Sequence, residues 1–181
     1  MEAVRDGSAA GLEFLMAEYE VRALRLAYTI TGDRASADEV VAEAFLKAYR
    51  NIDRFDVDRR FGPWFLKIVT NEALQLTRKA KRAERLRALL GRQERRSPDP
   101  VELAETNEVR RQVIAAVRDL PADQRAAITL RYLLDMDEKS VAETLGLPLG
   151  TLKTRLHRAR ARLRERLGGD LRVVTPEEGA R

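Results

Sequence analysis

The sequence predicts an all-α protein made of two small helical domains that are joined by a flexible linker. Apolar residues recur every three or four positions along most of the chain, which is the spacing of an amphipathic helix, and the alternation of a half-buried strand is missing. Glycine and proline punctuate these periodic segments. A polar stretch with two prolines, residues 92–100, lies between the two halves and marks the domain boundary.

The composition limits the kinds of protein that this chain can be. It has 181 residues, 44% hydrophobic and 35% charged, which suits one or two small cores. It has no cysteine and one histidine, which excludes disulfide scaffolds, thiolate metal sites and cysteine nucleophiles. We therefore expect no enzyme, no metal and no cofactor. No stretch approaches the roughly 20 apolar residues of a membrane span, so we expect a soluble, cytoplasmic protein.

The N-terminal half, residues 10–90, predicts a bundle of three or four helices. One helix carries an apolar side that we expect to form core, consisting of Val41, Phe45, Ala48 and Ile52. Glu39 and Glu43 lie one turn apart on an adjacent face. These two carboxylates are either a solvated face or a charged docking surface for a partner protein.

The next helix of this half combines apolar residues with side-chain amides. Pro63 suits its first turn. Two neighbouring stripes follow, one of Phe65, Val69, Ala73 and Leu76 and one of Trp64, Ile68, Asn71 and Gln75. Amides both donate and accept hydrogen bonds, as reading a base edge requires, and the helix continues into a basic run. The alternative is that Trp64 is ordinary core and Asn71 an ordinary surface amide, and spacing does not decide between them.

A helix-turn-helix is predicted in the C-terminal domain, residues 106–167, which follows the linker at 91–105 and precedes a loosely held tail at 168–181. After two helices, residues 137–145 form a short helix with Val141, Ala142 and Leu145 facing inward. A turn through residues 146–150 leads into a long helix. Its apolar stripe consists of Leu152, Leu156, Ala159, Leu163 and Leu167.

The face of the long helix opposite that stripe is predicted to enter a DNA major groove. At about 100° per residue, Thr154, His157, Arg158 and Ala161 fall on this face. Thr151, Lys153 and Arg155 flank it, where phosphates or the groove wall lie, and Thr151 is also a candidate N-cap. For His157 we weigh a metal ligand, which lacks partner ligands, against a solvated surface residue and a contact to a base or the DNA backbone.

Basic charge is concentrated in two segments. Residues 78–96 hold nine basic and two acidic residues, a net charge of +7, and residues 151–167 hold seven basic and one acidic residue, a net charge of +6. Because the whole chain carries only +5, the remainder sums to −8. A single basic helix is usually a solvated face, but one in each half of an otherwise acidic chain indicates a shared polyanionic partner.

Three segments resemble, in order, regions two and four of the extracytoplasmic-function (ECF) group of bacterial RNA polymerase sigma factors. They are ADEVVAEAFLKAYRNIDRFD at 37–56, FGPWFLKIVTNEALQLTRKAKR at 61–82 and LPADQRAAITLRYLLDMDEKSVAETLGLPLGTLKTRLHRARARL at 120–163. The most specific parts are Trp64, Ile68 and Asn71 in the second segment and the run at 150–160 in the third.

The resemblance implies a transcription initiation factor that binds core RNA polymerase, directs it to promoters and helps to open the duplex. The residues that would dock on the clamp helices of the largest polymerase subunit are Asp38, Glu39, Val41, Glu43, Phe45 and Leu46. Those that would engage the −10 element, including its non-template single strand, are Asn71, Gln75, Arg78, Lys79 and Arg82. Those that would read the −35 element as duplex are Arg131, Thr151, Lys153, Thr154, Arg155, His157 and Arg158.

The resemblance also implies a separate anti-sigma protein that covers the DNA-binding surfaces. Three positions depart from the family pattern: Ala42 and Ser140 put individual contacts in doubt, and Gln75 indicates a −10 preference of its own. Two DNA modules on a flexible connector reach the correct spacing only on a large scaffold, so the free protein should bind DNA poorly. The alternative is a stand-alone helix-turn-helix regulator whose residues 1–90 dimerise or sense a ligand.

Overall fold

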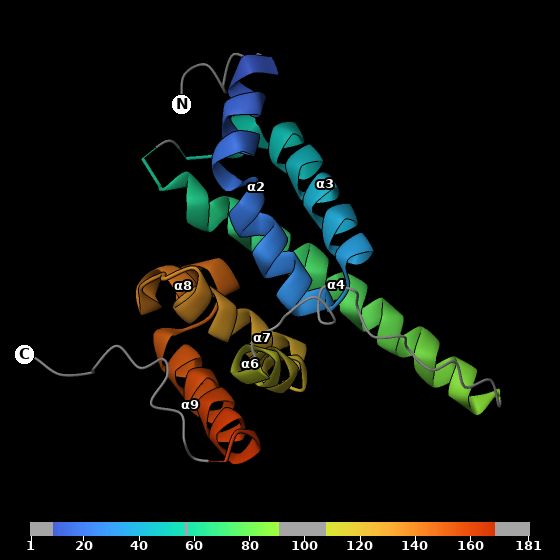
Figure 1. The fold of residues 1–181 in the computed structure, drawn as a ribbon. Coiled ribbons are helices and arrows are strands. Elements are labelled where there is room, and N and C mark those ends of the chain that lie inside the picture. The colour runs from blue at the N-terminus through green and yellow to red at the C-terminus, as the bar shows by residue number, and fades with distance from the viewer. Residues whose placement is uncertain (1–8, 57, 91–107, 169–181) are drawn as a thin grey trace, which may run out of the picture.

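The computed structural model describes residues 9–56, 58–90 and 108–168, and all of its regular structure in these ranges is helical (Figure 1). The prediction of an all-α fold is therefore confirmed. The N-terminal elements are α2 (Ala9–Thr31), α3 (Arg34–Arg50), the 3₁₀ turn η1 (Ile52–Arg54) and α4 (Phe61–Leu89). The C-terminal elements are α6 (Glu108–Arg118), α7 (Ala122–Ile128), the π-helical η2 (Thr129–Leu133), α8 (Glu138–Leu145) and α9 (Leu149–Arg166).

Two of the predicted segments cannot be compared with the structure. The predicted linker at 91–105 and nearly all of the predicted tail at 168–181 fall outside the described residues. Within the described ranges, no helix combines the length and the apolar character that crossing a bilayer requires.

Helices α2, α3 and α4 pack on one another around a cluster of aromatic rings. Phe65, completely buried, lies at its centre, with ring centroids 4.6 Å from Phe45 and 5.7 Å from Phe61. Trp64 packs beside them, 5.0 Å from the ring of Phe55, and is half-buried. Trp64 therefore packs against the core of this bundle, which agrees with the interpretation that it is an ordinary core residue.

Helix α4 has 29 residues and only its first half is packed into the bundle. Phe65, Val69 and Ala73 are fully buried, which confirms this part of the predicted apolar stripe. From Arg78 onward nearly every residue is exposed, and the helix projects beyond the rest of the molecule in Figure 1. Because no other helix among the described residues covers this second half, the helix itself holds its basic residues in solvent.

The helix-turn-helix forms from α8 and α9. Asp137 caps α8 by accepting a hydrogen bond from the Ser140 amide at 2.9 Å, and Gly146 ends the helix with a φ of 63°, which a residue without Cβ adopts freely. Val141 and Ala142 are buried, as predicted. The candidate N-cap Thr151 is wrong, because α9 begins at Leu149, directly after Pro148. Proline fixes φ near its helical value, and with Pro148 as the N-cap the helix starts three residues earlier than an N-cap at Thr151 would give.

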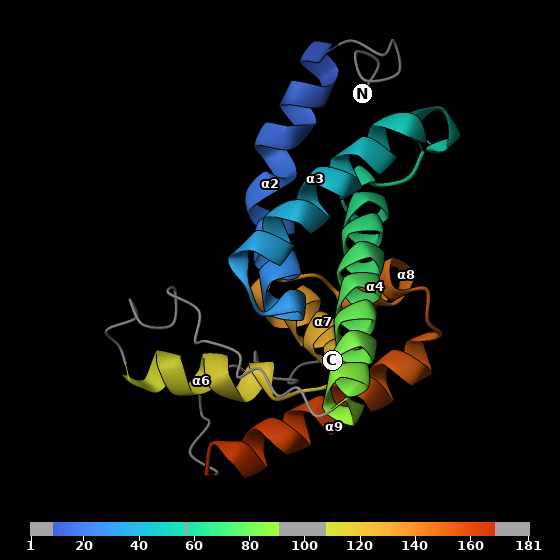
Figure 2. The same ribbon diagram turned by 90° about the vertical axis from the view of Figure 1, so that its right-hand side faces the viewer.

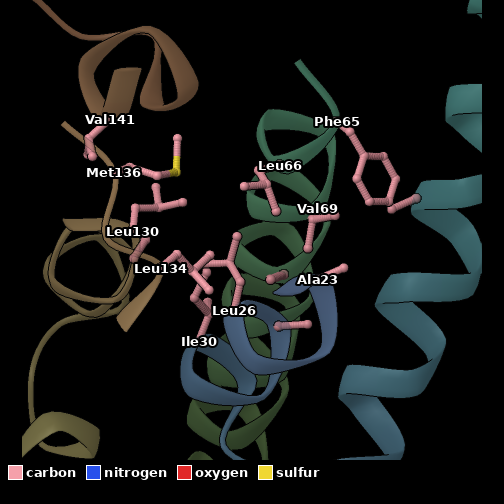
Figure 3. Packing of buried hydrophobic residues seen from close by; sticks show 14 of the residues in the cluster. Ala23, Leu26, Ile30, Phe65, Leu66, Val69, Leu130, Leu134, Met136 and Val141 are labelled. Carbon is pink, nitrogen blue, oxygen red and sulfur yellow. The ribbon is translucent and has the colours of Figure 1, made fainter. Parts of the chain in front are cut away.

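The two halves share one continuous core, which sequence reasoning did not predict. Helix α8 packs on α4, and α7 packs on α2. Figure 3 shows Leu26 and Ile30 of α2 beside Leu134, which follows η2. In Figure 2 the α7–α8 segment likewise lies against α2 and the first half of α4. The C-terminal domain is therefore docked on the N-terminal bundle in this structure.

A buried arginine anchors this docking at the C-terminus of α2. The Arg125 side chain, on α7, donates one hydrogen bond to the Ile30 carbonyl at 2.6 Å and another to the Arg118 carbonyl at 2.8 Å. The last carbonyls of a helix have no partner within the helix, and a cation there stabilises by about 0.3–2 kcal/mol. Arg22 on α2 adds a hydrogen bond to the Leu134 carbonyl at 3.3 Å.

Candidate nucleic-acid interface

The outward face of α9 is open to solvent along its first three turns. Leu152, Leu156 and Ala159 point into the domain and are buried, so the residues between them point out. The exposed set on this face is Thr151, Lys153, Thr154, His157, Arg158 and Ala161. The structure gives Arg158 no ion pair with any described residue, so its guanidinium is available to a ligand.

Four of the other five arginines of α9 have partners inside the domain. Arg155 lies 3.4 Å from Asp123, and Arg166 lies 2.8 Å from Asp119. Arg162 donates to the Gln124 side chain at 3.0 Å, and Arg160 donates to the Tyr132 hydroxyl at 3.4 Å. About half of the basic charge that the sequence places on this helix therefore holds the helix to its neighbours.

Arg131, predicted as a −35 contact, also has partners within the domain. Its guanidinium donates to the Met136 carbonyl at 3.3 Å and lies over the ring of Tyr132, 5.5 Å from the centroid. Its side chain is 25% exposed, which leaves one edge accessible. These contacts orient the turn that leads into α8.

The predicted −10 residues lie along α4 and are all exposed. Asn71 and Gln75 come first, and Arg78, Lys79 and Arg82 follow on the projecting half. The five side chains do not face one way, because Asn71 and Arg78 line a cleft toward the C-terminal domain whereas Gln75 and Lys79 line a groove toward α3.

The groove between α3 and α4 has a volume of about 440 Å³ and joins two predicted sites. Glu39, Glu43 and Leu46, predicted to dock on polymerase, line one wall. An ion pair crosses the groove, because Lys47 lies 2.7 Å from Glu72 on α4 and 3.6 Å from Glu43 on its own helix. The hydrogen bond to Glu72 raises the pKa of Lys47 above its ordinary value. Sequence reasoning did not identify this pair, whose members lie 25 residues apart.

The predicted polymerase-docking residues divide into a surface set and a core set. Asp38, Glu39 and Leu46 are exposed, and Glu43 is half-buried. Asp38 pairs with Arg34 at 3.0 Å. Val41 and Phe45 are each only 5% exposed, so in this structure they support α3 from inside and present no surface to a partner.

A cleft of about 490 Å³ separates the projecting face of α4 from the C-terminal domain. Asn71, Arg78 and Lys81 line the α4 side. Arg155 and Asp123 line the opposite side. Residues predicted for two different DNA elements thus share one cleft in this arrangement.

The described residues contain no cluster of three or more metal-ligating side chains. His157 in particular is an exposed residue on the outward face of α9, beside Arg158 and Thr154. Its position fits the solvated or DNA-contacting interpretations and offers no second ligand for a metal ion.

Two protein-family models match the chain, one in each half. The model described as Sigma-70 region 2 matches residues 15–83, and the model described as Sigma-70, region 4 matches residues 110–163. The first match includes α4 as far as residue 83, and the second includes the helix-turn-helix.

Curated relatives match over most of their own length. The ECF RNA polymerase sigma factor SigW of Bacillus subtilis is 31% identical over 158 residues, covering 82% of this chain and 84% of that protein. The ECF RNA polymerase sigma-E factor of Escherichia coli is 32% identical over 173 residues, covering 88% of each chain.

Solved structures also resemble this protein. The sigma factor RpoE from Bartonella quintana, crystallised with the anti-sigma factor NepR, has a TM-score of 0.67 and 26% identity, and the match covers 87% of this chain and 99% of that one. CnrH, solved with the cytosolic domain of CnrY, has a TM-score of 0.68 at 24% identity, covering 93% of this chain and 95% of that one, and supports the fold alone.

Proposed function

The chain belongs to the ECF group of the sigma-70 factors of bacterial RNA polymerase, and from this premise we propose how its surfaces act. The chain binds core polymerase, directs it to promoters through their −10 and −35 elements and assists strand opening. The observation that carries the proposal is the presence in one chain of both sigma regions, each with an exposed basic helix face.

We assign the −35 element to the outward face of α9. Its side chains suit a major groove, with Arg158 and His157 toward bases and Lys153 and Thr151 toward phosphates. Arg155 and Arg131 have partners within the domain, so their contribution is to position this face.

We assign the −10 element to α4. Asn71 and Gln75 offer amides that donate and accept, which suits the edge of an unstacked base. The uncovered cations Arg78, Lys79 and Arg82 continue along the same helix and suit the phosphates of the melted strand.

Core polymerase docks on α3 in this proposal. The accessible residues are Asp38, Glu39, Glu43 and Leu46, three carboxylates around one exposed leucine. An acidic rim around an apolar contact is complementary to a basic helical partner, such as the clamp helices of the largest subunit. Gln75 lines the same groove as Glu39, Glu43 and Leu46, which supports binding of polymerase and of the −10 strand on adjacent surfaces.

We also propose an anti-sigma protein as a regulatory partner. The related sigma factor from Bartonella quintana was crystallised with one, and its structure covers most of this chain. As the function is to direct another enzyme, we assign no catalytic residue.

The stand-alone regulator remains the second candidate function, and one feature separates it from the first. Such a regulator binds a palindromic operator as a dimer without polymerase, with half-sites one helical turn apart. The match of residues 15–83 to sigma region 2, in place of a dimerisation or sensing domain, favours the sigma factor.

Run-off transcription tests the proposal. Purified core polymerase is incubated with genomic fragments, with and without the full chain. The proposal predicts discrete transcripts that appear only when the chain is added. Tight operator binding by the chain alone, with no change in transcription by core polymerase, would establish the regulator instead.

A further inference from the structure

Two helices of the N-terminal half carry an apolar stripe that no other described helix covers. One stripe lies on the first half of α2, where Phe14 is 68% and Val21 is 56% exposed and Ala17 between them is exposed as well. The other stripe lies on the projecting half of α4, where Leu86 is 60% and Leu90 is 70% exposed. Exposed apolar residues that adjoin on one face mark sites of interaction, so each stripe is a candidate contact surface.

The two stripes have the same length and the same spacing. Their residues follow one another at intervals of three and then four positions: Phe14, Ala17 and Val21 on α2, and Ala83, Leu86 and Leu90 on α4. This is the a–d–a spacing of a coiled-coil heptad. At 1.5 Å per residue each stripe is about 10 Å long. The stripes can therefore pack against each other as two helices of a short coiled coil.

The charges that flank the two stripes are opposite in sign. When Phe14 and Ala83 are placed at position a of the heptad, the e and g positions flank each stripe. The charged residues at these positions have one sign on each helix: Glu13, Glu18 and Glu20 on α2, and Arg82 and Arg87 on α4. All five side chains are exposed, and none forms an ion pair with a described residue. Charges at e and g select the partner of a coiled coil, so the α2 stripe repels a second α2 stripe and attracts the α4 stripe.

The two stripes of one molecule are too far apart to meet. The first half of α2 and the projecting half of α4 lie toward opposite ends of the N-terminal helices in both Figure 1 and Figure 2. Contact between the stripes therefore needs two molecules. The charge pattern selects α4 of a second copy of this chain as the partner of α2.

We propose that two copies of this chain associate through the first half of α2 of one copy and the projecting half of α4 of the other. Each copy carries both stripes, so a pair related by a twofold axis forms the contact twice. The contact covers Arg82, which the proposed function assigns to the phosphates of the −10 strand. The consequence for promoters rests on that proposed function: an associated copy does not bind the −10 strand.

Sedimentation velocity of the full chain, without polymerase or DNA, measures the association. A short contact of this kind is weak, so the measurement extends to submillimolar protein concentrations. The parent protein should form a species with twice the mass of one chain. Its association constant should fall several-fold as the salt concentration rises, because the charges that flank the stripes are exposed.

Two charge-reversed variants test the two stripes separately. The first carries Glu13→Lys and Glu18→Lys on α2, and the second carries Arg82→Glu and Arg87→Glu on α4. Each variant alone should associate at least about tenfold more weakly than the parent protein, because attraction between flanking charges becomes repulsion. An equimolar mixture of the two variants should regain the association of the parent protein, since each α2 stripe then meets an α4 stripe of opposite sign.

A matched control changes the same amount of charge outside the stripe. Lys81→Glu combined with Arg85→Glu alters two exposed residues at the f and c positions of α4, which point away from a coiled-coil partner. The association constant of this control should stay within about twofold of that of the parent protein. Every changed side chain is exposed, so the helices should form as before, which circular dichroism checks.

A parent protein that stays monomeric at every concentration would overturn the inference. Association that neither variant weakens, that the mixture does not restore or that the control weakens equally would also overturn it. Run-off transcription with core polymerase separates this inference from the proposed function. A monomeric chain that directs transcription refutes the association alone. A chain that associates but directs no transcription refutes the proposed function, and with it the effect on promoters, but not the association.

Discussion

Arg158 is the residue whose role follows most directly from its surroundings. It is exposed at the centre of the outward face of α9, and no described residue pairs with it. Arg158→Ala should weaken binding of the holoenzyme to the upstream element by about 1–3 kcal/mol, the scale of one good base contact. The measurement is holoenzyme affinity for promoter fragments. Arg164→Ala removes an exposed arginine from the end of the same helix and should cost far less, so equal losses would contradict the assignment.

Asn71 should affect a different step. Asn71→Ala removes an exposed amide without changing the buried side of α4, so core binding should stay as in the parent protein. Opening of the −10 region should fall, by about 1–3 kcal/mol in the free energy of the open complex if the amide makes one good base contact. Permanganate footprinting of unpaired thymines measures it. A loss of affinity for core polymerase would show that this side of α4 docks on protein instead.

For single residues, the sequence predicts which side chains are exposed better than it predicts which partners they bind. The spacing of Leu152 and Leu156 places Arg158 on the open face, because helical geometry alone decides it. Spacing does not reveal that Arg155 and Arg162 bind Asp123 and Gln124, since those partners come from another helix. Val41 is a docking residue by resemblance to the family, and it is nevertheless buried.

Among the elements, α8 depends on its N-cap. Asp137 accepts hydrogen bonds from the Ser140 amide and hydroxyl, at 2.9 and 2.6 Å. Asp137→Ala should lower the free energy of unfolding by about 1 kcal/mol, as loss of a cap usually does, whereas Asp137→Asn keeps the cap. Urea denaturation measures both variants. Equal destabilisation by alanine and asparagine would mean that charge, rather than capping, is what matters.

The same cap gives a pH dependence with a defined direction. The Ser140 hydrogen bonds hold the pKa of Asp137 below its ordinary value of 3.8. A carboxylate whose pKa is lowered by folding adds stability above its unfolded pKa and loses it as the pH falls through the folded value. The stability difference between the parent protein and Asp137→Asn should therefore be constant near neutral pH and shift against the parent below about pH 4. A difference that does not vary down to pH 2 would contradict the role of this carboxylate.

Two glycines in the turn between α8 and α9 should respond oppositely to alanine. Gly146 has a φ of 63°, so Gly146→Ala should destabilise the protein by about 1–2 kcal/mol. Gly150 lies in the first turn of α9 with no atom within 4 Å of an added Cβ, so Gly150→Ala should stabilise it by about 0.4–1 kcal/mol. Thermal unfolding of the pair measures both, and a shift in the same direction would contradict the turn geometry.

The elements themselves could be predicted because each has a local cause. Periodicity predicted α8 and α9, and glycine predicted the turn at Gly146. The start of α9 was missed because the threonine at 151 and the proline at 148 both mark helix starts, and local sequence does not rank them.

For the whole molecule, the sequence predicts two helical domains but not their docking. Contacts such as Arg125 with Ile30, 95 residues apart, depend on complementary surfaces that leave no periodic signal. The polar stretch between the halves, residues 92–100, indicates a linker and therefore suggests independence, whereas the shared core holds the domains together. Family membership, by contrast, rests on motifs in both halves and was correct from sequence alone.

Base substitution through a promoter, with holoenzyme binding as the readout, tests most directly the claim that two helices of this chain read two separate promoter elements. We expect two groups of sensitive base pairs centred about 25 base pairs apart, or about 85 Å of duplex. Arg158→Ala should remove the sensitivity to upstream substitutions and leave the downstream group, and Asn71→Ala should do the reverse. A single group of sensitive base pairs, or loss of both groups together in either variant, would contradict the assignment of the two helices.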